Sequence, residues 1–344
     1  MALNMHGTVD SSAAIGADYD IAALSDYLTK IHIQENTQNQ QFMKFGDMSL
    51  NIPQNNSDTA KWSKYAKLSN DPTSYVLTEG VVPSGDNLTR TTLTSQLTQL
   101  GNFLSYSDKL KYTNDDKVLN EMNMKLADQS KEIMDIFVRN VLVAGTNVLW
   151  GGDATSTITV AVGDNITTAL IKKAVRNLQY NRTKKSKNWS AGSTKVGSSP
   201  VGASYIGICG AYVEADLKAL TGFVEVQSYA SVGDIMEDEI GYYAGVRFIR
   251  TDVPYIDVDG GDSNANVHSV IIFGKEAYGI TRLEGKALEV IVKPDTMGGH
   301  DNPLNQFGTI GWKGYIASRI LKQENIIRLE VTATDSEADI TSAV

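Results

Sequence analysis

Cysteine and histidine are scarce in this 344-residue sequence, which contains only Cys209 and four histidines. A single cysteine cannot form an intrachain disulfide, so nothing indicates an oxidising compartment. The histidines are far apart and lack the HxxxH or HExxH spacing of metal sites (His6, His32, His268 and His300). No apolar run approaches the ~20 residues that span a bilayer, and the acidic start lacks the basic region of a secretory signal. We therefore expect a protein made in the cytosol, with no metal, no cofactor and no membrane partner.

Enzyme signatures are also missing. The sequence contains no GxGxxG, GxxxxGK[ST] or GxSxG motif, and its nearest phosphate-loop candidate, GITRLEGKA (279–287), has one residue too many between its glycines. Cys209 lies in an apolar stretch, which favours a small buried side chain over a catalytic thiolate. We predict that the chain is not an enzyme. The alternative is a soluble cytosolic enzyme whose site is assembled from residues remote in sequence, within residues 163–274.

The stretch DVDGGDSNAN (257–266) is similar to the start of a calcium-binding loop. An EF-hand loop needs glycine at position 6 and glutamate at position 12, where this sequence has Asp262 and His268. The composition therefore favours a surface turn.

The charge balance is acidic. Lys and Arg total 31 against 40 Asp and Glu, a formal net charge of -9, which argues against a large basic face that wraps nucleic acid. One basic run stands out, at Lys172, Lys173, Arg176, Arg182, Lys184, Lys185 and Lys187. Its residues could contact phosphates. Alternatively, the run is a solvated face, or a subunit contact opposite the acidic run MEDE (236–239).

Helical and strand patterns alternate along the chain, which predicts an α+β fold. The clearest helix is expected over 113–145, with Asn114 as its N-cap, and others over 164–180 and 211–220. Strands are expected over 204–210, 245–252 and 268–274 and in the C-terminal part, where Trp312 and Tyr315 would anchor the packing. Residues 1–58 are mostly polar and interrupted by one amphipathic segment, whose apolar stripe must dock on the body or on another subunit (Ile21, Leu24, Leu28 and Ile31).

A turn followed by one long strand is predicted between residues 83 and 107. The segment 58–69 fits a helix or a strand equally well, and turn chemistry follows at 83–87. A single strand from Leu88 to Ser107 would extend roughly 66 Å, far beyond an ordinary strand. Its first half is polar on both faces. Its second half would be rooted in the body by four apolar side chains (Leu100, Phe103, Leu104 and Tyr106).

Taken in order, several stretches resemble the major capsid proteins of tailed phages with the Hong Kong 97-like fold, specifically the group typified by the podophage N4. The matching text spans about residues 60–332 and reads LTEGVVPSGDNLT, LTQLGNFLSYSDKL, VRNVLVAGTNV, IKKAVRNLQ, AGVRFIRT, IIFGKEAYG and NPLNQFGTIGWKGY. The N-terminal fifty residues and the segments 181–202 and 255–267 show no match.

The resemblance implies a domain plan. Residues 1–58 would be an N-terminal arm, 59–109 an extended loop built as a β-hairpin, and 110–162 a peripheral domain with a long spine helix. Residues 163–274 would form the axial domain, and 275–344 would return to the peripheral domain and end in a tail. Within this plan, the segment 58–69 becomes a strand of the hairpin.

The resemblance also implies a function: a major capsid protein that self-assembles into hexamers and pentamers of an icosahedral phage head enclosing double-stranded DNA. Portal, scaffolding and decoration proteins would be further partners, and the protein would be found in the virion and, during assembly, in the host cytoplasm. Charged hairpin residues are the candidate inter-subunit contacts (Lys61, Lys64, Lys67, Glu79, Asp86 and Arg90). Exposed ion pairs contribute ~0 to 1 kcal/mol each, so they would set register more than strength.

Overall fold

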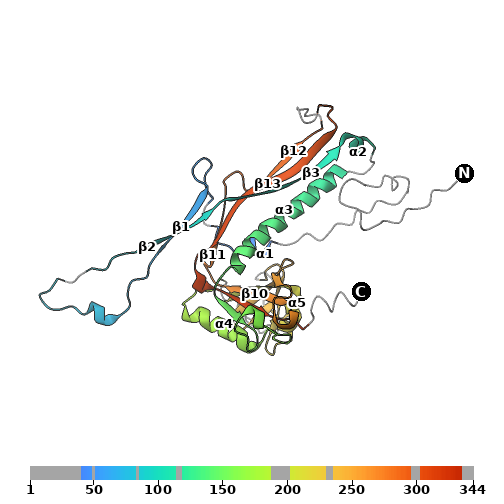
Figure 1. The fold of residues 1–344 in the computed structure, drawn as a ribbon. Coiled ribbons are helices and arrows are strands. Elements are labelled where there is room, and N and C mark those ends of the chain that lie inside the picture. The colour runs from blue at the N-terminus through green and yellow to red at the C-terminus, as the bar shows by residue number, and fades with distance from the viewer. Residues whose placement is uncertain are drawn as a thin grey trace.

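The computed structural model describes residues 40–48, 51–82, 85–113, 118–186, 202–229, 235–295 and 303–334. A compact block, an elongated layer and a projecting ribbon make up this part of the chain (Figure 1). Helices and sheets are mixed, which confirms the predicted α+β class. The amphipathic segment around Ile21 and the basic residue Lys187 lie outside the described residues. No helix among the described residues is long and apolar enough to cross a bilayer.

The compact block is built on an eight-stranded mixed sheet. Its strands follow the order β4, β14, β10, β5, β8, β7, β6, and β9 pairs with β10 at the side. The bounds are β4 (Val148–Trp150), β5 (Tyr205–Cys209), β6 (Val224–Glu225), β7 (Glu239–Tyr243), β8 (Val246–Arg250), β9 (Ile256–Asp257), β10 (Val267–Phe273) and β14 (Ile326–Val331).

Strand β10 is buried along its whole length, as its apolar run VIIF (270–273) favours for a central strand, and it also buries His268 and Ser269. Alternate side chains face opposite sides of the sheet. Val270 and Ile272 join a core with the helices α4 (Thr168–Tyr180) and α5 (Ala211–Lys218). Ile271 and Phe273 belong to the core on the other side, which continues into the elongated layer.

The elongated layer is a four-stranded sheet with a long helix along one face (Figure 1). Strand β13 (Phe307–Ile320) pairs with β3 (Thr98–Ser107) on one side, and with β12 (Glu289–Lys293) and β11 (Tyr278–Arg282) on the other. Helix α3 (Val118–Val143) packs its apolar stripe on this sheet and confirms the predicted long helix, while Asn114 lies outside the described residues. Short helical segments complete the layer and the connections: α2 (Asp108–Thr113), η2 (Pro72–Tyr75), η3 (Thr157–Thr159), η4 (Val226–Ser228), η6 (Asp262–Asn264) and η7 (Gln323–Asn325).

Trp312 is an anchor of this packing, but Tyr315 is not equivalent to it. The two side chains lie on opposite faces of the sheet because they are an odd number of residues apart. Trp312 is only 3% exposed and belongs to the core with α3. Tyr315 is half-buried on the other face, where the Lys313 ammonium lies 5.2 Å from its ring centre.

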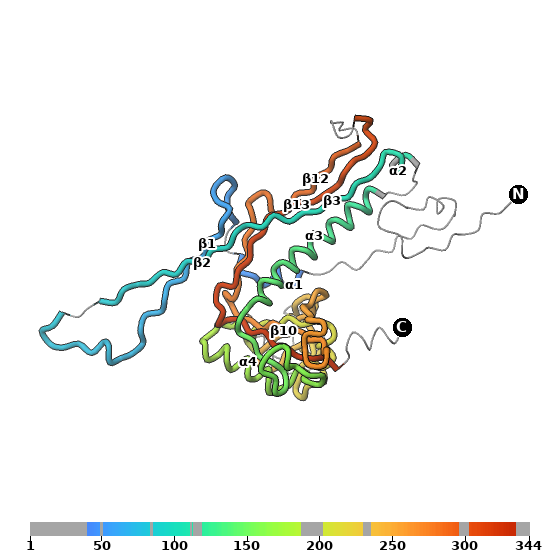
Figure 2. Tube along the Cα trace, viewed as in Figure 1, coloured from blue at the N-terminus to red at the C-terminus, as the bar shows by residue number. Residues whose placement is uncertain are grey.

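The projecting ribbon consists of β1 (Thr59–Tyr65) and β2 (Arg90–Gln96), which pair antiparallel. The ambiguous segment is therefore a strand, as the resemblance implied. Beyond the paired strands, the chain from residue 66 to residue 89 forms a wide loop that reaches away from the body (Figure 2). Its described residues are all exposed, so the loop adds nothing to the core of its own chain.

The prediction of one uninterrupted strand from Leu88 to Ser107 was wrong. The strand is interrupted at Leu97, whose backbone amide donates to the carbonyl of Asp58, the residue just before β1. Before the break β2 pairs with β1, and after it β3 pairs with β13. The break is the point where the ribbon leaves the sheet.

A short helix, α1 (Gln41–Lys44), lies between α3 and the compact block. Its side chains Phe42 and Met43 are each 2% exposed and fill the core at this junction. The chain that follows runs parallel to β11, with bridges from Asp47 to Gly279 and from Ile52 to Leu283, before it enters β1.

Candidate assembly surfaces

The wide loop of the ribbon carries several large apolar side chains that its own chain leaves in solvent. Val82 is 91% exposed, and the same holds to a lesser degree for Tyr75, Val76, Leu77, Val81 and Leu88. Monomeric proteins rarely leave apolar side chains exposed in such a group, and those that do present a contact surface. Sequence reasoning missed this surface because it concentrated on the alternating residues of the strand. Most of the exposed apolar side chains lie in the loop, before that strand begins.

The loop has internal order despite its exposure. Asp71 caps η2 by accepting hydrogen bonds from the backbone amide and the hydroxyl of Thr73, at 3.0 and 2.7 Å, which lower the pKa of Asp71. Across the loop, the Tyr75 hydroxyl donates to the Asp86 carboxylate at 2.6 Å, and this bond raises the pKa of Tyr75. The two sides of the loop are therefore tied together, which lowers the entropy that a partner would have to remove.

The six charged residues predicted as inter-subunit contacts do not form one site. Three of them contact their own chain: Lys64 lies 3.7 Å from Glu324, Asp86 accepts from Tyr75, and Arg90 donates to the Ser63 hydroxyl. The other three side chains are exposed along the ribbon and its loop (Lys61, Lys67 and Glu79). Their role between subunits stays a prediction.

The ribbon is fixed to the body by a small apolar cluster of its own. Ala60, Ile52 and Ala317 are buried there, with Trp62 and Leu97 packed against them. The Trp62 ring lies against Gly279, where a Cβ atom would come within 2.9 Å of the indole nitrogen. The inward side chains of β1 and β2 alternate with exposed ones, so the ribbon root does have a buried face. The prediction of a first half that is polar on both faces therefore fails at this root, where Leu93 is half-buried.

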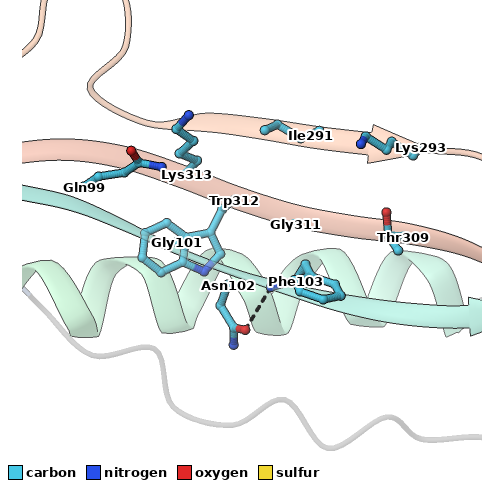
Figure 3. A pocket seen from close by; sticks show the side chains of 10 residues that line it. All are labelled: Gln99, Gly101, Asn102, Phe103, Ile291, Lys293, Thr309, Gly311, Trp312 and Lys313. Atoms are coloured by element: carbon cyan, nitrogen blue, oxygen red, sulfur yellow. Dashed lines mark hydrogen bonds between the residues drawn. The ribbon is translucent and has the colours of Figure 1, made fainter.

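A groove of about 590 Å³ crosses the face of the four-stranded sheet that lies opposite α3. Figure 3 shows its lining from three adjacent strands, with Phe103 on β3, Gly311 on β13 and Ile291 on β12. Gly101 and Gly311 leave its floor without side chains, and a Cβ at Gly311 would come within 2.8 Å of the Phe103 Cβ. The remaining lining residues are Gln99, Asn102, Lys293, Thr309, Trp312 and Lys313.

Phe103 does not root the ribbon in the body, contrary to the prediction. It is 65% exposed, whereas Tyr106 is 6% exposed and Leu100 and Leu104 pack partly on the core. The even-numbered residues of β3 face α3, so odd-numbered Phe103 must face the groove. Together with Ile291 it gives the groove an exposed apolar wall.

The predicted basic run lies along the exposed face of α4 and just after it. Lys172, Lys173 and Arg176 are exposed on the helix, opposite the side that packs on the sheet. Arg182, Lys184 and Lys185 follow at its C-terminal end, and all three are exposed. The structure thus brings six of the seven residues together on one side of the compact block.

Two carboxylates of the acidic run MEDE have partners in their own chain, and a contact between this run and the basic run of another subunit stays a prediction. Glu239 is buried, lies 3.5 Å from the Arg247 guanidinium and accepts a hydrogen bond from the Tyr229 hydroxyl. Glu237 pairs with Lys44 at 3.3 Å. Glu239 therefore belongs to the interior of the block, whereas Glu237 stays exposed at its surface.

A depression of about 260 Å³ on the compact block collects carboxylates, the feature that the enzyme alternative requires. Three of its four acids have partners in their own chain. Glu214 pairs with Lys218 at 2.6 Å and with Arg250 at 3.8 Å, Glu239 is held by Tyr229, and Asp238 accepts from the Gln41 amide. No group of three or more potential metal ligands occurs among the described residues.

The stretch 257–266 forms a surface turn around η6, in agreement with its composition. Cys209 is buried in β5, as predicted, and burial raises the pKa of its thiol.

Comparisons with known proteins place the fold. No family model and no curated protein matches the chain. Among solved structures, it is similar to the capsid asymmetric unit of cyanophage Pam1 (TM-score 0.65, 14% identity, 93% of this chain and 100% of that one). It is also similar to the capsid of Ralstonia phage GP4 (TM-score 0.67, 13% identity, 95% and 100%). A third similar structure is the capsid of Helicobacter pylori bacteriophage KHP30 (TM-score 0.59, 14% identity, 93% and 100%). The chain therefore has the fold of phage capsid proteins over nearly its whole length.

Proposed function

We propose that this protein is the major capsid protein of a tailed phage, with the Hong Kong 97-like fold in its N4-type form. The observation that carries this proposal is the match of nearly the whole chain to capsid subunits, including the ribbon that a monomer does not need. In this reading residues 163–274 are the axial domain, and the layer of α3 and β13 is the peripheral domain. The protein acts in the virion and assembles in the host cytoplasm.

In this proposal the geometry of the contacts between copies determines the assembly. Copies associate head to tail into hexamers and pentamers, since a heterologous contact closes into a ring when its rotation fits. These rings form an icosahedral shell around double-stranded DNA, with portal, scaffolding and decoration proteins as further partners. Buried contact area between copies supplies the stability, and the charged ribbon residues set register.

The exposed apolar surfaces suggest how neighbouring copies meet. The loop between β1 and β2 presents Val81 and Val82, and the groove on the sheet presents Phe103 and Ile291. Each surface is apolar and uncovered by the described part of its own chain. We place the loop of one copy over the sheet of the next, where both surfaces lose their contact with water.

Truncation of the loop tests this function. In the test variant, Asn-Gly replaces residues 68–87, which retains the paired strands because the Ala66 amide already bonds to the Thr89 carbonyl at 2.8 Å. We expect a soluble subunit with the circular dichroism spectrum of the parent, because the loop buries nothing. Negative-stain micrographs should show shells for the parent and none for the variant.

The matched control is Gly85→Ala in the same loop, where a Cβ has no atom within 4 Å. This control should assemble like the parent. Shells formed by the truncated variant would contradict the role of the loop. A parent that remains monomeric under all conditions of salt and concentration would overturn the capsid function itself.

A further inference from the structure

The segment that precedes the ribbon ties three parts of the molecule together. We call residues 40–48 and 51–58 the strap. Its first part, α1, lies between α3 and the compact block, and its second part follows the edge of β11 to the ribbon (Figure 1). These partners are distant in sequence, so the contacts of the strap are tertiary and separate from local helix or turn formation.

On the side of α3, the strap is held by a buried carboxylate. Asp135 is 1% exposed, and its Oδ1 accepts a hydrogen bond from the Met43 amide at 2.9 Å. The amides of Gln41 and Phe42 also face this carboxylate. Amides at the start of a helix have no partner within the helix, so Asp135 satisfies them from outside.

On the side of the compact block, the strap is held by polar side chains. The side-chain amide of Gln41 donates to the Asp238 carboxylate at 2.9 Å, and the Lys44 ammonium pairs with the Glu237 carboxylate at 3.3 Å. Both acids directly precede β7. The short helix α1 therefore joins α3 to the compact block through contacts on both of its sides.

Along β11, the strap adds a short parallel ladder. The Asp47 amide donates to the Tyr278 carbonyl, and the Ile280 amide donates to the Asp47 carbonyl, both at 3.0 Å. The same pattern recurs around Ile52, at 2.9 Å. The Tyr278 hydroxyl also donates to the Phe42 carbonyl at 2.6 Å. These contacts link α1 to the segment that leads into the ribbon.

We infer that the strap is a conformational coupling device, which holds the compact block and the ribbon at one orientation relative to α3 while α1 is seated. Release of α1 frees both parts to turn together. This inference rests on the proposed function for its biological meaning, because subunits of one shell occupy non-identical surroundings. Phe42 and Met43 make the seated state favourable, since their removal would leave a cavity in the core.

The test measures orientation in the unassembled subunit. Spin labels are attached at Asn123→Cys on α3 and Lys172→Cys on α4, both exposed positions. The native Cys209 is buried with a raised thiol pKa, so it does not compete for the label. Pulsed electron resonance then gives the distribution of distances between the two labels.

Two variants release the strap by different routes. Asp135→Leu removes the acceptor of the α1 amides, and the double variant Gln41→Ala/Lys44→Ala removes the side-chain links to the compact block. For both, we expect a broadened or second distance population. Amide exchange in residues 41–47 should accelerate at least about tenfold, the factor that corresponds to one lost buried hydrogen bond. The control, Asp128→Leu, changes a half-buried acid of α3 whose ion pair is with Lys131 of the same helix, and it should match the parent.

An unchanged narrow distribution in either folded variant overturns the inference, since the hydrophobic core alone would then fix the orientation. If Asp135→Leu fails to fold, the double variant decides, because both of its changes truncate polar side chains and leave the buried Phe42 and Met43 in place. Failure of the parent to form shells would overturn the capsid function and leave this result intact, since the distances are measured on single subunits.

Discussion

At the scale of single residues, Asp135 is the most unusual group in the described structure. Burial raises its pKa to about 6, although the facing amides of α1 and the nearby Arg139 oppose this shift. Tyr278 and Arg282 of β11 pack around the same site, and Lys44, Glu237 and Asp238 flank α1. The folded chain therefore holds a proton on Asp135 at a pH where the unfolded chain has released it.

This shift predicts a pH dependence of stability. The raised pKa contributes stability that is fully present below pH ~4 and is lost as the pH rises through about 6. In Asp135→Asn the group no longer titrates. The unfolding free energy of the parent minus that of the variant should thus fall by about 1–3 kcal/mol as the pH rises from 4 to 7. Urea denaturation at closely spaced pH values measures this difference.

The matched control is Asp128→Asn, at a half-buried acid of the same helix that pairs with Lys131. The fall measured for Asp135→Asn should exceed any change measured for this control. A flat difference for Asp135→Asn as well would show that the carboxyl titrates alike in the folded and unfolded chains.

Asp135 also shows why sequence reasoning missed the residues that join the parts of the molecule. In the sequence it is one acid among the polar residues of an amphipathic helix, between Met134 and Ile136. Its partners are the amides of a short helix about ninety residues earlier, in a segment whose composition predicted only a polar arm. Helical periodicity identifies the buried face, but it carries no information about which distant backbone will cover it.

At the scale of elements, local chemistry was sufficient for the helices and the central strands. The apolar run of β10 and the amphipathic pattern of α4 were predicted with nearly their observed bounds. The long strand was not, because its break at Leu97 depends on a change of partner from β1 to β13. The alternation of side chains along the sequence continues through this break with little change. The change of pairing partner is therefore visible only in the structure.

The groove on the four-stranded sheet yields a prediction at this scale. Phe103→Thr retains a strand-forming side chain and removes the aromatic wall. Because Phe103 is 65% exposed in the subunit, its unfolding free energy should change by less than about 1 kcal/mol. If a neighbouring copy covers the groove, shell yield should fall at least tenfold. Sedimentation of assembled particles, together with thermal denaturation of subunits, measures both quantities.

The comparison variant is Tyr180→Thr, at an aromatic residue of α4 that is 87% exposed. It should assemble like the parent, since no groove of the described sheet contains it. Equal shell yields for Phe103→Thr and Tyr180→Thr would place the contact between copies elsewhere.

At the scale of the whole molecule, an acidic subunit carries one basic face. The net charge of -9 limits general adhesion to DNA, which would suit the proposed shell around DNA. The exposed side of α4 departs from this balance, because Lys172, Lys173 and Arg176 share it and the helix contains no acidic residue. The charge of the molecule is therefore unevenly distributed, and only the local face is suited to phosphates.

This arrangement predicts weak, salt-dependent DNA binding that depends on the α4 face. The triple variant Lys172→Gln/Lys173→Gln/Arg176→Gln should bind duplex DNA less tightly than the parent. Each lost phosphate contact lowers the slope of log K against log salt by about 0.9, so three contacts lower it by about 2.7. Fluorescence anisotropy with a labelled duplex, at salt concentrations from 50 to 200 mM, measures this slope.

A second triple variant separates the local face from net charge. Lys61→Gln/Lys67→Gln/Lys293→Gln removes three exposed lysines elsewhere and gives the same total charge. The slope of log K against log salt for this variant should stay close to that of the parent, because none of the three lysines lies on the α4 face. Equal losses in both triple variants would mean that DNA senses only the overall charge. The basic run would then be a solvated face of the compact block, as the sequence alone already allowed.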